Sequence, residues 1–98
     1  MTSTEPDTQS YETETDEMMM RRLVYRASYT GMKETDLLLG QFAKRHLPEL
    51  TRAQLHEFEA LLDAGDPSIF AWVRGDEAVP EVYDTAVFDL IKKFEVTK

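Results

Sequence analysis

Apolar side chains that recur three and four residues apart constrain this chain more than any other feature. This spacing puts them on one face of a helix, and it occurs in five successive segments between residues 17 and 96. No segment shows the apolar–polar alternation of a half-buried strand. The apolar positions are Met20, Leu23, Val24 and Ala27; Leu38, Leu39, Phe42 and Ala43; Leu55, Phe58, Leu61 and Leu62; Ile69, Phe70, Trp72 and Val73; and Val82, Ala86, Leu90 and Phe94, with Val87 and Ile91 beside them. The sequence therefore predicts an all-α fold, a compact bundle of five short helices.

Residues that start or stop helices separate the five segments. Gly31 is expected to end the first helix as its left-handed C′ residue, and Pro48 prevents the second from continuing beyond about His46. Thr51 and Gln54 have the spacing of a capping box at the start of the third helix. The remaining signals are an N-cap and N1 pair at Asp66-Pro67, a stop at Gly75 and a new start after Pro80.

Acidic residues gather at the start of the chain. Residues 1–17 hold six acids and no base, whereas the whole chain carries a net charge of −8 at pH 7. Residues 1–16 are too polar to bury the apolar surface that would offset the entropy of ordering, so we predict a disordered acidic tail before a five-helix domain over residues 17–96. The remainder of the chain, residues 18–98, holds thirteen acids and eleven bases and is close to neutral, which argues against nucleic acid as a partner.

The composition also limits the chemistry that this chain can perform. It has no cysteine, which excludes disulfides, thiolate catalysis and cysteine-ligated zinc. His46 and His56 fall on different predicted helices without a supporting ligand set, so no metal site is expected. No triad-like arrangement or glycine-rich phosphate loop is present, so no catalytic residue and no enzyme activity are expected. No apolar run approaches the roughly 20 residues of a membrane span.

The turn Thr30-Gly31-Met32-Lys33-Glu34 carries the main resemblance to a known family. The chain resembles the flavinator of succinate dehydrogenase family, whose motif reads Arg-Gly-x-x-Glu. Gly31 and Glu34 match this motif, Met32 and Lys33 fill its variable positions, and Thr30 stands where the family has arginine. The other shared landmarks, in order, are Arg21-Arg22-Leu23, Leu37-Leu38-Leu39, Phe42-Ala43, Asp66-Pro67 and Trp72.

The resemblance implies a function as well as a five-helix fold. It implies a non-catalytic assembly factor, a chaperone that binds the flavoprotein subunit of succinate dehydrogenase (respiratory complex II) or of fumarate reductase and promotes covalent attachment of FAD. FAD would then be the partner's cofactor, with none held stably by this chain, which we expect to be a monomer. The family, and a start that resembles neither a secretory signal nor a mitochondrial presequence, lead us to expect a bacterial cytoplasmic location.

We expect the partner-binding surface at the turn and on the helix ends beside it. Because Thr30 cannot supply the charge of the family's arginine, we hypothesise that Arg26 places a guanidinium on the same surface and that Arg22 extends the basic patch. The expected contact residues are Gly31, Glu34, Thr30, Met32, Lys33, Arg26, Arg22 and Tyr29.

Several of these residues also have a purely structural explanation. A left-handed cap selects Gly31, and the helix macrodipole favours Glu34 in a first turn. The two arginines can equally form a solvated face, and at least one of Tyr25 and Tyr29 is expected to pack into the core. The alternative function is therefore a generic helical protein–protein adaptor, or a small regulatory partner, unrelated to flavin attachment.

Overall fold

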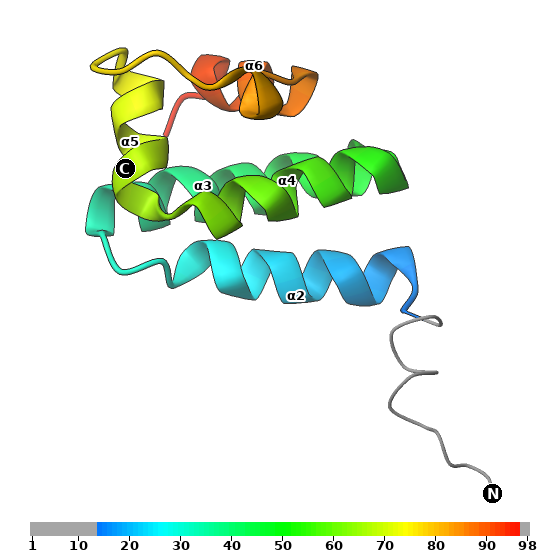
Figure 1. Cartoon of the computed structure of the whole chain (residues 1–98). Helices are drawn as coiled ribbons and strands as arrows, with labels where there is room; N and C mark the ends of the chain where they lie inside the picture. The colour runs from blue at the N-terminus through cyan, green and yellow to red at the C-terminus, as the bar shows by residue number, and fades with distance from the viewer. Residues whose placement is uncertain (1–13, 97–98) are drawn as a thin grey trace, which may run out of the picture.

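Five α-helices and two short 3-10 helices form the part of the chain that the structure, a computed structural model, describes, residues 14–96. The elements, labelled as in Figure 1, are α2 (Asp16–Ser28), α3 (Lys33–His46), η1 (Leu47–Glu49), α4 (Arg52–Ala64), α5 (Asp66–Arg74), η2 (Glu81–Tyr83) and α6 (Ala86–Lys93). No strand occurs in this range, and the predicted all-α bundle of five helices is confirmed. None of the helices between residues 14 and 96 is both long and apolar enough to cross a membrane.

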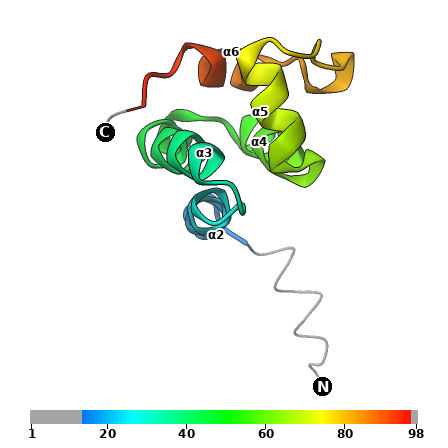
Figure 2. The ribbon, with the colours of Figure 1, turned by 90° about the vertical axis from the view of Figure 1, so that its left-hand side faces the viewer.

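The helices lie in layers around α3 and α4. In Figures 1 and 2, α2 forms the lowest layer, α3 and α4 lie above it, and α5 and α6 lie at the top. α2 contacts both α3 and α4, while α6 packs on α3 and α4 from the opposite side. As a result, the outer side of α2 is covered by no other helix in the described range.

The core is built from the stripes of α3 and α4. All the apolar positions predicted for these two helices are buried, so both stripes are confirmed. Phe42 lies at the centre, with its ring centroid 5.7 Å from that of Phe58 and 5.8 Å from that of Phe94. Trp72 of α5 closes one side of the core and stacks on Tyr83 at 5.1 Å. The aromatic rings therefore join α3, α4 and the C-terminal segment into one core.

The buried face of α2 is displaced by one residue from the predicted stripe. Met19, Leu23 and Ala27 are buried, whereas Met20 and Val24 are only partly covered. The three buried positions lie four residues apart, on one ridge that faces α3 and α4. Met20 and Val24 were wrongly placed at the centre of this face and lie instead at its border with α3.

The face predicted for the last helix is wrong at its start, at Val82 and Ala86, and omits Phe88. Val82 and Ala86 are exposed, while Val87, Phe88 and Ile91 are buried. A single helix after Pro80 would have put Val82 in line with Leu90 and Phe94. Instead, η2 ends at Tyr83, and a new helix starts where the Thr85 side chain accepts a hydrogen bond from the Phe88 backbone N–H. This break resets the register, which brings Phe88 into the core.

Helix caps agree with the predicted signals to within about one residue. The capping box of Thr51 and Gln54 is present, and Gly75 ends α5 in a left-handed conformation. Gly65, rather than Asp66, is the N-cap of α5, so Asp66 is its first residue. This positive-φ glycine lets α4 and α5 follow each other almost without a linker.

The first helix begins within the segment that we assigned to the acidic tail. Thr15 caps α2 by accepting a hydrogen bond from the Met18 backbone N–H, at 3.1 Å. Glu14 and Asp16 form ion pairs with Arg22 and Arg52. Residues 14–16 are thus part of the helical domain, and the remainder of the predicted tail, residues 1–13, lies outside the described residues, as do residues 97–98.

Candidate functional site

The turn between α2 and α3 is built around Gly31. Its φ of +114° is a backbone conformation that residues with a side chain rarely adopt. The predicted positive φ is confirmed, but the predicted C′ position is not, because α2 ends at Ser28 with Tyr29 as its C-cap and Gly31 lies two residues beyond that cap. A methyl group added at Gly31 would lie 3.4 Å from Asp66 Oδ2, so the backbone of the turn runs close to the start of α5.

Asp36 fixes the shape of this turn. Its Oδ1 accepts two hydrogen bonds from Thr30, one from the backbone N–H and one from the side-chain hydroxyl, each at 2.5 Å. These bonds from Thr30, together with one from the Gly31 backbone N–H, lower the pKa of the Asp36 carboxyl. Thr30, which stands in place of the family's arginine, therefore closes the turn, and Asp36 proves to be its cap.

Replacing Asp36 with alanine is expected to destabilise the folded protein by about 1 kcal/mol, the usual contribution of a capping side chain. Because the pKa of Asp36 is lower in the folded chain than in the unfolded chain, this contribution is present above the unfolded-state pKa and is lost as pH falls through the folded-state pKa. Urea unfolding of wild type and Asp36→Ala at pH 7 and at pH 2.5 measures both effects. Thr30→Val, which removes only the hydroxyl donor, should give a smaller loss; an equal cost of Asp36→Ala at both pH values would contradict this account.

The first turn of α3 leaves its polar side chains accessible. Met32 is the N-cap but makes no side-chain cap hydrogen bond, and Lys33 and Glu34 are exposed. Within residues 14–96 neither Lys33 nor Glu34 forms an ion pair. The motif glutamate is therefore available for contact with another molecule, although its position also suits the dipole of α3.

The two arginines expected to form a basic patch are paired with acids of α4. Arg26 donates to Asp63 at 2.6 Å, and Arg22 donates to Glu59 at 2.5 Å. Arg22 also holds Glu14 with two hydrogen bonds, at 2.9 and 3.0 Å, which lower the pKa of Glu14. Arg22 thus joins the start of α2 to α4. Arg26 lies nearer the turn, and with 42% of its side chain exposed it can still be reached from solvent.

Tyr25 and Tyr29 stand together on the outer side of α2. Their ring centroids are 4.8 Å apart, and each residue is 70% exposed. The expectation that at least one of them packs into the core is wrong, because the core positions of this helix are taken by Met19, Leu23 and Ala27. An exposed aromatic pair beside the turn is typical of a contact surface.

The structure thus places the predicted contact residues in two groups. Tyr29, Thr30, Gly31, Met32, Lys33 and Glu34 form the turn and the start of α3, which Arg26 borders. Arg22 lies farther from the turn, nearer the start of α2, where it contacts α4. The sequence suggested that Asp36 and Asp63 are surface or capping residues but did not identify their partners: Asp36 caps a turn six residues before it, and Asp63 lies 37 residues after Arg26. No group of three or more side chains suited to a metal ion occurs among residues 14–96.

The fold and this site define a small helical-bundle protein whose exposed interhelical turn is held in a fixed shape. A family model described as flavinator of succinate dehydrogenase matches residues 21–95, which include the turn and reach the last helix. The chain belongs to this family.

Relatives in three eukaryotes carry the same name, succinate dehydrogenase assembly factor 2, mitochondrial. The chain is 40% identical to the Dictyostelium discoideum protein over 76 residues, which cover 78% of this chain and 54% of that protein. It is 46% identical to the Scheffersomyces stipitis protein over 73 residues (74% and 49%) and 34% identical to the Danio rerio protein over 76 residues (76% and 48%). The chain therefore spans about half the length of these relatives.

The comparisons overturn the expected bacterial cytoplasmic location. The matched relatives are named as mitochondrial proteins and come from eukaryotes. The expectation rested partly on the acidic character of residues 1–16, which describes only that segment and does not identify a compartment.

Proposed function

We propose that this chain is a non-catalytic assembly factor that binds the flavoprotein subunit of succinate dehydrogenase and promotes covalent attachment of FAD to that subunit. The observation that carries the proposal is the family match over residues 21–95, because it includes the whole turn and the helices that hold it. FAD is then the cofactor of the partner, with none held stably by this chain. In this proposal the related fumarate reductase flavoprotein is a second client, and the chain acts as a monomer.

The contact surface in this proposal is the turn and its borders: Gly31, Glu34, Thr30, Met32, Lys33, Arg26, Arg22 and Tyr29. The hydrogen bonds of Asp36 hold the turn in one shape, so little conformational entropy is lost there on binding. The glycine lets a partner approach the backbone, and Glu34 offers an unpaired carboxylate. Binding that favours one conformation of the flavoprotein subunit would raise the population in which its own side chain can react with the flavin.

Arg26 supplies the charge that Thr30 lacks in this proposal. Its guanidinium is half exposed and held by one acid, Asp63, so a carboxylate of the partner can replace or share that contact. Arg22 is less suited to this role, because its guanidinium already forms ion pairs with both Glu14 and Glu59.

Arg26→Ala is therefore expected to weaken binding of the purified succinate dehydrogenase flavoprotein subunit by about tenfold, the effect of losing one charged contact in an interface. Arg52→Ala is the matched control, since Arg52 also links α4 to α2, through Asp16 at 2.8 Å, but at the end of α2 remote from the turn. Titration calorimetry measures both variants. Equal losses would show that Arg26 acts only through the stability of the bundle, and no binding by wild type would refute the proposed function.

A further inference from the structure

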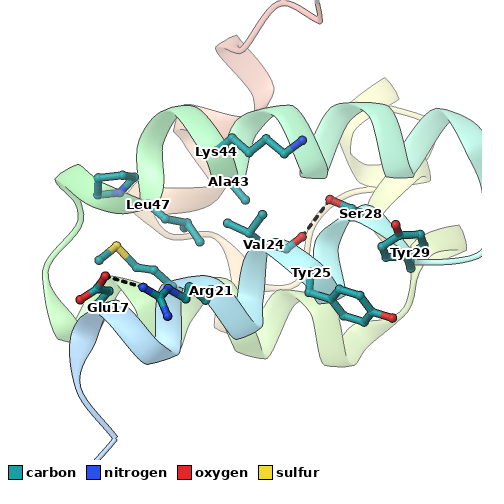
Figure 3. A pocket seen from close by; sticks show the side chains of 11 residues that line it. Glu17, Arg21, Val24, Tyr25, Ser28, Tyr29, Ala43, Lys44 and Leu47 are labelled. Atoms are coloured by element: carbon teal, nitrogen blue, oxygen red, sulfur yellow. Dashed lines mark hydrogen bonds and ion pairs between the residues drawn. The ribbon is translucent and has the colours of Figure 1, made fainter.

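An apolar groove runs along the side of α2 that no helix covers. Its main part, of about 580 Å³, lies between α2 and the C-terminal half of α3 with η1. Figure 3 shows Val24 and Tyr25 from α2 on one side and Ala43, Lys44 and Leu47 on the other. At Ser28 and Lys44 the groove adjoins a second hollow of about 340 Å³, which continues past Leu37 to Lys33 beside the turn.

The residues that line this groove follow the periodicity of a helix on both sides. On α2 and its C-cap they occupy positions 17, 20, 21, 24, 25, 28 and 29, and on α3 they occupy positions 33, 36, 37, 40, 41, 43 and 44. Within each set, residues recur at separations of three and four, so each set forms one stripe along its helix. Two adjacent stripes of this kind form the groove into which the ridge of a third helix packs.

The middle of the groove is held by a close contact between the two helices. A methyl group added at Gly40 would lie 3.0 Å from Ser28 Oγ, so α3 can approach α2 only because position 40 has no side chain. The Ser28 hydroxyl donates to the Val24 carbonyl oxygen at 2.8 Å, which satisfies it within α2. The groove is thus preformed and leaves an apolar floor with few unsatisfied polar groups.

The unpaired charge along the groove is positive. Arg21 is held by Glu17 at 2.8 Å, and Asp36 is held by the turn. Lys33 and Lys44 form no ion pair with any residue of the 14–96 range. They are eleven residues apart on α3, which is about three helical turns or about 16 Å, on the same face. An occupant that complements this groove carries acids at the same separation.

We propose that this groove binds an amphipathic acidic helix of a partner protein. Its apolar stripe would lie over Val24, Tyr25 and Tyr29, and two of its carboxylates would meet Lys33 and Lys44. A second copy of this chain fits less well, because two chains that each carry a net charge of −8 repel each other electrostatically. The proposal requires no particular partner, so it can fail while the role in flavin attachment stands.

A designed peptide tests this directly against the full chain. The probe is an 18-residue capped helical peptide with leucines at positions 4, 8, 11 and 15 and glutamates at positions 3 and 14, about 16 Å apart. Control peptides replace the glutamates with lysine or the leucines with glutamine. Amide shifts in two-dimensional NMR are expected to map the glutamate–leucine peptide to residues of the groove, and both control peptides should bind at least about tenfold more weakly.

Variants of exposed residues complete the test. The double variant Tyr25→Ser with Tyr29→Ser should bind the peptide about tenfold more weakly or worse. Lys44→Glu should reverse the preference, so that the lysine peptide binds better than the glutamate peptide. Val82→Ser is the control, because Val82 is also apolar and 74% exposed but lies outside the groove. The proposal is overturned by absence of binding, by equal binding of the two charged peptides, by equal loss in Val82→Ser, or by a groove filled by residues 1–13 or by a second copy.

Discussion

Replacing Phe42 with alanine is expected to lower the free energy of unfolding by about 3–5 kcal/mol, the largest stability effect that we anticipate from one substitution. The Phe42 side chain is fully buried, and its ring contacts those of Phe58, Phe94 and His46. These partners come from α3, α4 and the segment after α6, so truncation leaves a cavity where three parts of the bundle meet. Because a domain of this size has a net stability of about 5–15 kcal/mol, the variant should be close to unfolding.

Urea denaturation, followed by circular dichroism, measures this loss. Tyr25→Ala serves as the control, because that ring is exposed and its removal should change the stability by less than about 0.5 kcal/mol. A loss below about 1 kcal/mol in Phe42→Ala would show that the core is not organised around this ring.

Valine at position 31 is expected to reduce binding of the succinate dehydrogenase flavoprotein subunit by more than about tenfold. A β-branched residue strongly disfavours a φ of +114°, so the turn must rearrange. The rearrangement moves Thr30 away from Asp36 and brings a side chain towards Asp66, which closes the approach to the backbone. The stability cost of such strain is only about 1–3 kcal/mol, so the folded state should persist.

Gly75→Val separates loss of the turn from simple destabilisation. Gly75 also has a positive φ, +85°, and a methyl group there would meet no atom within 4 Å. It ends α5 rather than the turn between α2 and α3. The two valine variants should therefore lose similar stability in urea, while only Gly31→Val loses affinity in calorimetry. Equal affinities of the two variants would remove the turn from the proposed interface.

The parts of the fold that the sequence predicts well are those with local causes. The stripes of α3 and α4 are complete because each helix has a clear start and stop and one uninterrupted period. The capping box at Thr51 and Gln54 depends on residues three apart and needs no tertiary information. In contrast, the face of α6 depends on whether Val82 belongs to the same helix as Leu90, and the 3-10 helix that separates them leaves no periodic signal.

The site is harder to predict because its key contacts join distant positions. In the sequence, Arg22 and Arg26 of α2 suggest a basic patch. In the structure they pair with Glu59 and Asp63 of α4, each 37 positions later in the chain. The place of Thr30 in the motif suggests a missing charge, whereas its two hydrogen bonds to Asp36 give it a role in shaping the turn. The exposure of Tyr25 and Tyr29 follows from the rotation of α2 about its axis, which the pattern misjudged by one residue.

Covalent flavin on the succinate dehydrogenase flavoprotein subunit, seen as fluorescence in a denaturing gel, tests the central claim most directly. The subunit is expressed with FAD available, with and without this chain, and its amount is measured by immunoblot. The account predicts an equal amount of subunit in both cases, with strong flavin fluorescence only when this chain is present and reduced fluorescence with Gly31→Val. Equal covalent flavin with and without this chain would contradict the account.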